Sequence, residues 1–89
     1  MAFAMTINVL FFASLKEELG LESMTLDVHD SFCNRAELLE LLQNKLGRER
    51  IAPLLMENVA IAVNQTIEKA DFTVQTGDEV AFLPPITGG

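Results

Sequence analysis

The residues best suited to chemistry stand at the end of the chain, which reads Leu83-Pro84-Pro85-Ile86-Thr87-Gly88-Gly89. Two consecutive prolines cannot continue a strand ladder and favour a stiff, extended segment. The two glycines that follow carry no side chains, so the walls of a partner protein can approach the last carboxylate closely. At roughly 3.3 Å per residue, residues 84–89 can reach about 20 Å beyond a folded domain. The pattern predicts an extended tail that enters a narrow channel in another protein.

The carboxylate of Gly89 is the group with the clearest chemical use. A carboxylate is a poor electrophile because its negative charge repels nucleophiles, but a partner enzyme can use ATP to convert it into an acyl adenylate. Transfer of sulfide would then give a thiocarboxylate, which is a reactive sulfur donor. The alternative is a frayed chain end without a role, which is the default for termini. A Gly-Gly end behind a stiff Pro-Pro segment favours the chemical role.

Composition predicts one acidic domain, residues 1–83, in front of this tail. The chain has 89 residues and a net charge of −7, with only six Lys and Arg residues. Six scattered cations form no basic patch, which disfavours nucleic acid and anionic membranes and favours a basic or mixed protein partner. The apolar start has no preceding Lys or Arg and is interrupted by Thr6 and Asn8, so we expect a buried strand in a cytosolic protein rather than a signal peptide.

The single cysteine and the single histidine argue against a transition-metal site, and we also expect the protein to hold no bound cofactor of its own. Transition-metal sites need several Cys or His residues at set spacings, and Cys33 and His29 have no companions of their kind. We interpret Cys33 as a small, half-buried residue in front of a helix. We interpret His29 as a surface residue at a strand end rather than a general base.

Hydrophobic periodicity and helix-capping signals predict the elements of the first half of the chain. Ser14, with Glu17 as a capping-box partner, is expected to start a short helix that stops at Gly20. Asn34 and Glu37 form the same signal for the main helix, whose apolar stripe is Leu38, Leu39, Leu41, Leu42 and Leu46 and which ends at Gly47. Alternating residues predict strands over 6–12 and 24–28, paired with each other.

The second half of the chain is predicted to complete a sheet. Residues 48–56 are expected to form a helical turn or two, broken near Pro53. Alternation predicts a strand over 59–63, a tight turn at Asn64-Gln65, a short strand over 66–68, a turn at 76–78 and a last strand over 79–83. This order predicts an α+β fold of the β-grasp, or ubiquitin-like, type, with a mixed sheet of four to five strands and one main helix packed on one face.

The two faces of the predicted sheet are both apolar, which is unusual for a lone domain. The face towards the helix is expected to carry Ile7, Val9, Phe11, Leu26, Ile61, Val63, Val80 and Phe82. The opposite face is expected to carry Leu10, Phe12, Ala60, Ala62, Ala81 and Leu83. A contiguous exposed apolar patch predicts a partner surface. The alternative is that loops or the short first helix cover it.

Three segments resemble the small subunits of molybdopterin synthase: residues 9–13 (VLFFA), residues 62–66 (AVNQT) and residues 77–89, the last being the most specific. The resemblance covers the chain from Met5 and implies the β-grasp fold. It also implies that an ATP-dependent adenylating enzyme of the ubiquitin-E1-like kind activates Gly89, that a sulfurtransferase supplies the sulfur, and that the tail enters the large synthase subunit. The interface positions of the family fall on Phe12, Ile67 and Leu83, and the tail residues that would contact the partner are Pro84, Pro85, Ile86, Thr87 and Gly88.

In that family two carriers deliver two sulfurs to cyclic pyranopterin monophosphate in a heterotetramer of two small and two large subunits, and the pterin chemistry belongs to the large subunit. Three other functions share much of the same pattern. Sulfur carriers for thiamin thiazole or for tRNA thiolation have the fold and the Gly-Gly end, although thiazole carriers usually lack the double proline. A ubiquitin-like protein modifier shares the activation chemistry, and a passive β-grasp binding module would make no use of Gly89.

Overall fold

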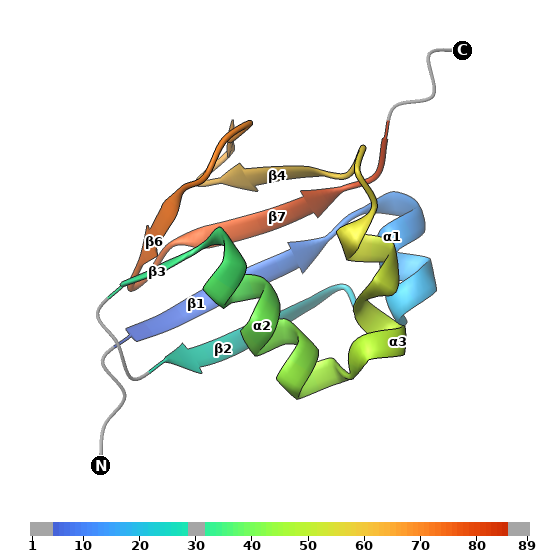
Figure 1. Cartoon of the computed structure of the whole chain (residues 1–89), viewed down its shortest axis with the longest axis horizontal. Helices are drawn as coiled ribbons and strands as arrows, with labels where there is room; N and C mark the ends of the chain where they lie inside the picture. The colour runs from blue at the N-terminus through green and yellow to red at the C-terminus, as the bar shows by residue number, and fades with distance from the viewer. Residues whose placement is uncertain (1–4, 29–31, 86–89) are drawn as a thin grey trace.

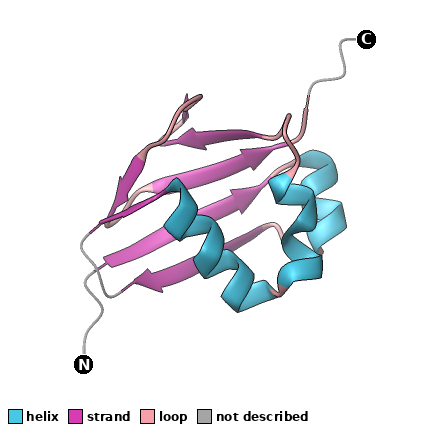
Figure 2. Cartoon of the chain, in the orientation of Figure 1, coloured by secondary structure: helices cyan, strands magenta, loops and turns pink. Residues whose placement is uncertain are grey.

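The computed structural model describes residues 5–28 and 32–85, which form an α+β fold with helices on one face of a mixed sheet (Figures 1 and 2). The strands of the main sheet are β1 (Met5–Phe11), β2 (Ser23–Val28), β4 (Ala60–Val63), β5 (Thr66–Ile67) and β7 (Glu79–Leu83). The helices are α1 (Ala13–Leu19), α2 (Arg35–Leu46), α3 (Arg48–Ile51) and the 3-10 helix η1 (Ala52–Leu55). A second small sheet pairs β3 (Phe32–Asn34) with β6 (Thr73–Gln75).

The order of strands in the main sheet is β2-β1-β7-β4-β5, so the first and the last strands of the chain lie side by side at its centre. β1 pairs with β7 in parallel, whereas the β1–β2, β4–β7 and β4–β5 pairs are antiparallel. The predicted β-grasp fold is confirmed, including the antiparallel first pair, the five-stranded mixed sheet and the main helix on one face. No described helix is long and apolar enough to span a bilayer.

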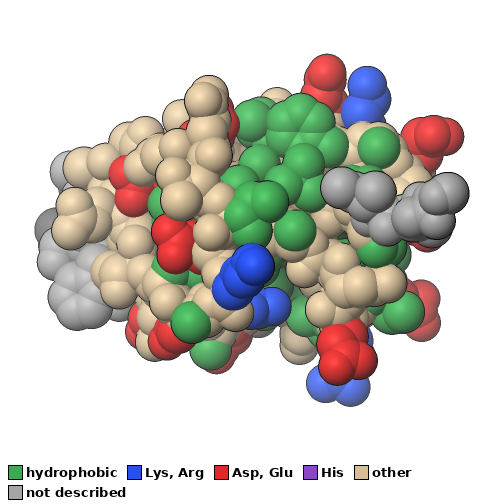
Figure 3. Space-filling model, turned by 90° about the horizontal axis from the view of Figure 1, so that it is seen from above, with side chains coloured by type: hydrophobic (Ala, Val, Ile, Leu, Met, Phe, Trp, Pro, Cys, Tyr) green, Lys and Arg blue, Asp and Glu red, His purple; other side chains and the backbone are tan. Residues whose placement is uncertain are grey.

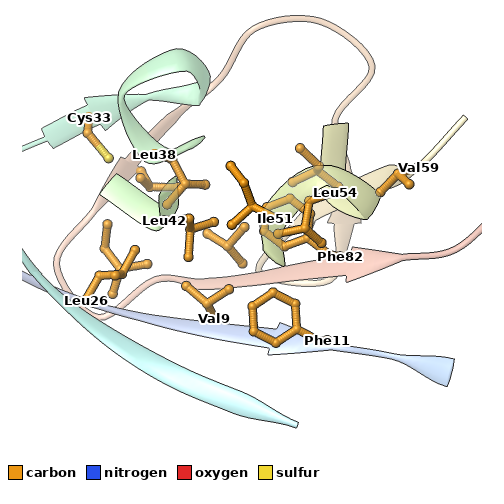
Figure 4. Packing of buried hydrophobic residues seen from close by; sticks show 14 of the residues in the cluster. Val9, Phe11, Leu26, Cys33, Leu38, Leu42, Ile51, Leu54, Val59 and Phe82 are labelled. Atoms are coloured by element: carbon orange, nitrogen blue, oxygen red, sulfur yellow. The ribbon is translucent and has the colours of Figure 1, made fainter. Parts of the chain in front are cut away.

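The core lies between the sheet and α2, α3 and η1 (Figure 4). Leu38 and Leu42 of α2 are fully buried and face the strands. Phe11 of β1 stacks on Phe82 of β7, with 5.8 Å between the ring centroids. The other members of the predicted leucine stripe, Leu39, Leu41 and Leu46, are partly buried at its edges. The predicted inward face of the sheet is confirmed, although Val63 is only partly buried.

The capping signals of α2 are confirmed in full. The backbone N–H of Glu37 donates to Oδ1 of Asn34 at 2.9 Å, and the backbone N–H of Asn34 donates to Oε1 of Glu37 at 2.9 Å. At the other end, the N–H of Gly47 donates to the carbonyl oxygen of Gln43 at 2.8 Å. These bonds satisfy backbone groups that a helix end otherwise leaves unpaired.

The predicted start of the first helix is wrong. The helix begins at Ala13, so Ser14 lies inside its first turn and no side chain caps it. Instead, the carbonyl oxygen of Phe12 accepts a hydrogen bond from the N–H of Leu15 at 3.1 Å. Ala13 has a φ of 49°, a left-handed conformation that turns the chain from strand to helix within one residue. Phe12 is therefore a cap residue rather than the end of the strand, while the predicted stop at Gly20, with a φ of 71°, is confirmed.

The second sheet was not predicted, and it corrects the interpretation of Cys33. This residue belongs to β3, pairs in register with Val74 of β6 and is only 2% exposed, so it is a core residue rather than a half-buried one. Three-residue strands are too short for alternation to be recognised in a sequence. His29, whose position at a strand end was predicted, lies outside the described residues.

Truncation at the centre of α2 tests this description of the core. We expect Leu42→Ala to lower the free energy of unfolding by about 2–5 kcal/mol, because it removes a fully buried side chain and leaves a cavity. Leu55→Ala is the matched control, since Leu55 is 51% exposed and should change stability by about 0.5 kcal/mol or less. Urea denaturation followed by circular dichroism measures both. Equal effects of the two variants would show that α2 does not pack as described.

Candidate partner-binding surface at the root of the tail

The sheet face turned away from the helices is divided into a polar and an apolar half. Thr6 and Asp27 lie in the polar half, and the hydroxyl of Thr6 donates to Oδ1 of Asp27 at 3.2 Å. Two residues further along β1 from the polar Asn8, the face becomes apolar at Leu10. Strand register extends this apolar half across the sheet in one row, Leu10, Ala81, Ala62 and Ile67. The apolar half is the end of the sheet from which the tail departs.

A groove of about 480 Å³ lies in this apolar half, beside Pro84 and Pro85, which we call the root of the tail. We call it the outer-face groove, and its lining residues are Phe12, Ala13, Asn58, Ala60, Ile67, Leu83, Pro84 and Pro85. Phe12 and Ile67 are 43% and 54% exposed, high values for large apolar side chains. Figure 3, which looks down on the β4 side of the molecule, shows hydrophobic side chains gathered in one contiguous area. Such an area is typical of an interaction surface.

The three interface positions that the resemblance implied come together in this groove. Phe12 comes from the cap of α1, Ile67 from β5 and Leu83 from the end of β7, and all three line the same hollow. The alternative, in which the first helix or a loop covers this face, is not seen in the described residues, because Phe12 and Ile67 remain exposed.

Two residues of the predicted patch are not exposed. Ala62 and Ala81 are 5% and 7% exposed, although they face away from the helices. Alanine has a small side chain, whereas Leu10, the register partner of Ala81, and Ile67, the register partner of Ala62, have larger side chains. The two alanines therefore form a floor between larger side chains, and the surface that a partner can reach is smaller than predicted.

Ile67 owes its position to the tight turn that precedes it. Asn64 and Gln65 have φ values of 50° and 71°, as in the two-residue turns that join twisted antiparallel strands. The side-chain amide of Asn64 donates to Oδ1 of Asp78 at 3.0 Å, and its Oδ1 accepts from the N–H of Glu79 at 2.9 Å. These bonds tie the β4–β5 hairpin to the start of β7. The predicted turn is confirmed, and it carries Ile67 to the edge of the groove.

The tail starts beside Phe12 because β1 and β7 run in parallel. The N–H of Phe12 donates to the carbonyl oxygen of Phe82 at 3.1 Å, and β7 ends one residue later at Leu83. Pro84 is half-buried and Pro85 is exposed, and both follow the strand without regular structure. The predicted site residues Ile86, Thr87, Gly88 and Gly89 lie outside the described residues. The boundary of the tail and the role of Gly89 thus stay predictions.

Two lining residues, Ala13 and Asn58, were not predicted. Asn58 lies in the turn before β4, and its only sequence signal is that of an ordinary turn residue. Ala13 had no signal in the sequence, because its residue type disfavours the left-handed conformation that it adopts. Within residues 5–28 and 32–85, no cluster of three or more Cys, His, Asp or Glu side chains could hold a metal ion. The described lining of the groove contains no Cys, His, Asp or Glu side chain.

Comparison with known proteins gives consistent matches over nearly the whole chain. The model of the ThiS family matches residues 9–89. The molybdopterin synthase sulfur carrier subunits of Haemophilus influenzae and Escherichia coli are each 37% identical over 83 residues, covering 93% of this chain and 99% of the relative.

Solved structures agree on the fold. SAMP1 from Haloferax volcanii has a TM-score of 0.77 at 22% identity, covering 94% of this chain and 99% of that one, which shows the fold alone. A chain from the complex of subunits 1 and 2 of the molybdopterin-converting factor of Helicobacter pylori has a TM-score of 0.67 at 29% identity, covering 96% of this chain and all (100%) of that one. The chain belongs to the ThiS family of β-grasp proteins, together with the sulfur carrier subunits of molybdopterin synthase.

Proposed function

We propose that this protein is the sulfur carrier of molybdopterin synthase and that it works in molybdenum cofactor biosynthesis. The observation that carries the proposal is the match, over 93% of the chain, to sulfur carrier subunits of that enzyme. The exposed apolar groove at the root of the tail supports it, because a carrier must dock on a partner while its tail reaches into the active site of that partner. A domain of this kind needs no catalytic acid or base of its own.

The chemistry takes place on the carboxylate of Gly89. An adenylating enzyme of the ubiquitin-E1-like kind joins the carboxylate to AMP from ATP and releases pyrophosphate. A sulfur nucleophile at the oxidation level of sulfide, supplied by a sulfurtransferase system, then displaces AMP and leaves a thiocarboxylate. When the sulfur passes to cyclic pyranopterin monophosphate, hydrolysis returns the carboxylate. Two such turnovers supply the two sulfurs of the dithiolene, and the carrier holds no cofactor of its own.

Docking on the large synthase subunit would use the outer-face groove. Phe12 and Ile67 are large, exposed and adjacent to the tail, so a partner that buries them also receives the tail in a fixed direction. Aromatic side chains at the centre of an interface often carry much of its binding energy. We propose a heterotetramer of two small and two large subunits, working in the cytosol.

Gly89 is the first residue to test. Deletion of Gly89 should abolish the transfer of sulfur to cyclic pyranopterin monophosphate in a complex reconstituted with the large subunit. It should change the free energy of unfolding by no more than about 0.5 kcal/mol, as expected for a change outside the core. An unfolded deletion variant would contradict the separation of tail and domain. Full activity of the variant would indicate a passive binding module.

The modification itself can be observed by intact mass spectrometry. Incubation with cell extract, ATP and a sulfur donor should add the mass difference between sulfur and oxygen, located in the C-terminal peptide. Sulfur that reaches only thiazole or tRNA would assign the carrier to those pathways. An unmodified mass, together with covalent ladders that depend on Gly89 in a pull-down under denaturing conditions, would identify a protein modifier instead.

Phe12→Asp tests the docking surface. The variant should weaken binding to the large subunit at least about 30-fold, because it places a charge in an apolar contact, while the domain remains folded. Leu55→Asp is the matched control, because Leu55 is 51% exposed and does not line the groove. Isothermal titration calorimetry measures both affinities. Equal binding of the wild type and the Phe12 variant would exclude the outer-face groove as the interface.

A further inference from the structure

A second groove lies on the other side of the tail root. It has a volume of about 550 Å³ and opens between α1, the α3–η1 segment and the start of the tail. We call it the helix-side groove, and the lining residues that matter here are Glu18, Glu49, Pro53, Met56, Pro84 and Pro85. The outer-face groove shares Asn58, Pro84 and Pro85 with it. The root of the tail is therefore the ridge between two grooves.

The helix-side groove has the composition of a contact surface. Its floor is apolar and includes Pro53 and the buried Leu15. Met56 at its margin is 60% exposed, the largest value among the exposed large hydrophobic side chains of the described residues. Methionine side chains are flexible and adapt to differently shaped partners, so an exposed methionine beside a groove favours contact with another protein.

Two carboxylates on the groove have no cationic partner in the described part of the chain. The one ion pair found there joins Lys16 to Glu22, at 3.8 Å. Arg50, which follows Glu49, instead donates from Nε to the carbonyl oxygen of Leu19 at 3.0 Å. Glu18 and Glu49 thus add negative charge to an apolar groove, and neither forms an ion pair within the described residues. A partner that presents a Lys or Arg side chain next to an apolar one would match both features.

The position of the helix-side groove indicates which partner protein would bind in it. Pro84 and Pro85 line both grooves, so a partner that encloses these two residues contacts both grooves at once. If only the outer-face groove were used, one side of the tail root would remain in water. Because the two grooves share the tail root, a single partner can cover both without bending the chain.

We propose that the helix-side groove is the second half of the docking surface for the large synthase subunit, which places a Lys or Arg side chain against Glu18 and Glu49. This inference rests on the proposed function, since it assigns a further contact to the same partner. It divides the interface into an apolar half on the sheet and an acidic half on the helices. The acidic half should raise the rate of association with the large subunit and orient the two proteins as they meet, because charges at the rim of an interface act mainly on the association rate.

Charge reversal tests the proposal. The double variant Glu18→Arg/Glu49→Arg should bind the purified large subunit at least about 10-fold more weakly at low salt, because it opposes like charges. Its affinity should also fall less with added sodium chloride than that of the wild type. The control Glu17→Arg/Glu40→Arg makes the same change in net charge at two exposed residues that line neither groove. It should bind nearly as the wild type does, and urea denaturation verifies that both double variants are folded.

Phe12→Asp separates failure of this inference from failure of the proposed function. If Phe12→Asp weakens binding while Glu18→Arg/Glu49→Arg binds like its control, the helix-side groove is not part of the interface and the inference is wrong. If neither variant weakens binding, both the inference and the proposed docking of the large subunit on the outer-face groove are wrong. If the double variant binds the large subunit normally but is no longer adenylated, the activating enzyme occupies the groove, which also overturns the proposal as stated.

Discussion

The parallel pairing of β1 with β7 is the contact on which the rest of this structure depends. It places the first and last strands of the chain at the centre of the sheet, with Val9 beside Val80 and Phe11 beside Phe82. All four side chains are at most 1% exposed, so they form the middle of the core. Two parallel strands also end at the same edge of the sheet, which brings Phe12 next to the root of the tail. One pairing thus joins the core of the domain to its candidate site.

The two faces of the sheet have different uses because only one of them is covered. Burial of apolar side chains beneath α2 and the α3–η1 segment is the main favourable contribution to folding. The other face stays open, and its apolar half is confined to the end where the tail departs. The core cluster does not include the exposed side chains Phe12 and Ile67, although Ala62 and Ala81 of this half are buried. Residues such as Phe12 and Ile67 are free to serve contact with a partner, as their exposure of 43% and 54% indicates.

The tail root lies between two grooves that differ in charge. On one side lies an apolar groove built from strand ends, and on the other a groove lined by Glu18 and Glu49, which form no ion pair within the described residues. The chain is acidic overall, with a net charge of −7, so electrostatic attraction to a cationic partner would act before contact. An apolar contact beside the tail and a charged contact behind it would together define one orientation of entry.

Local signals predicted most of the elements, and they failed where tertiary packing overrides local preference. The Asn34–Glu37 capping box, the Asn64-Gln65 turn and the strand over 79–83 were all confirmed, since the residues that signal each of them are close in sequence. The start of α1 was wrong because Ala13 adopts a left-handed conformation that its residue type disfavours. The β3–β6 sheet was missed because its partners are three residues long and distant in the chain.

The sequence by itself determined the β-grasp type of fold, the inward face of the sheet and the family resemblance, because periodicity, turn residues and a short motif are local properties. Through that resemblance it also predicted three candidate interface positions. Only the tertiary structure decided that Phe12, Ile67 and Leu83 line one groove, that Ala62 and Ala81 are buried between larger neighbours, and that a second groove, lined in part by Glu18 and Glu49, shares the tail root. These facts depend on the register between strands and on the docking of α1 against the α3–η1 segment. Such contacts join residues far apart in the chain, and no local pattern encodes their geometry.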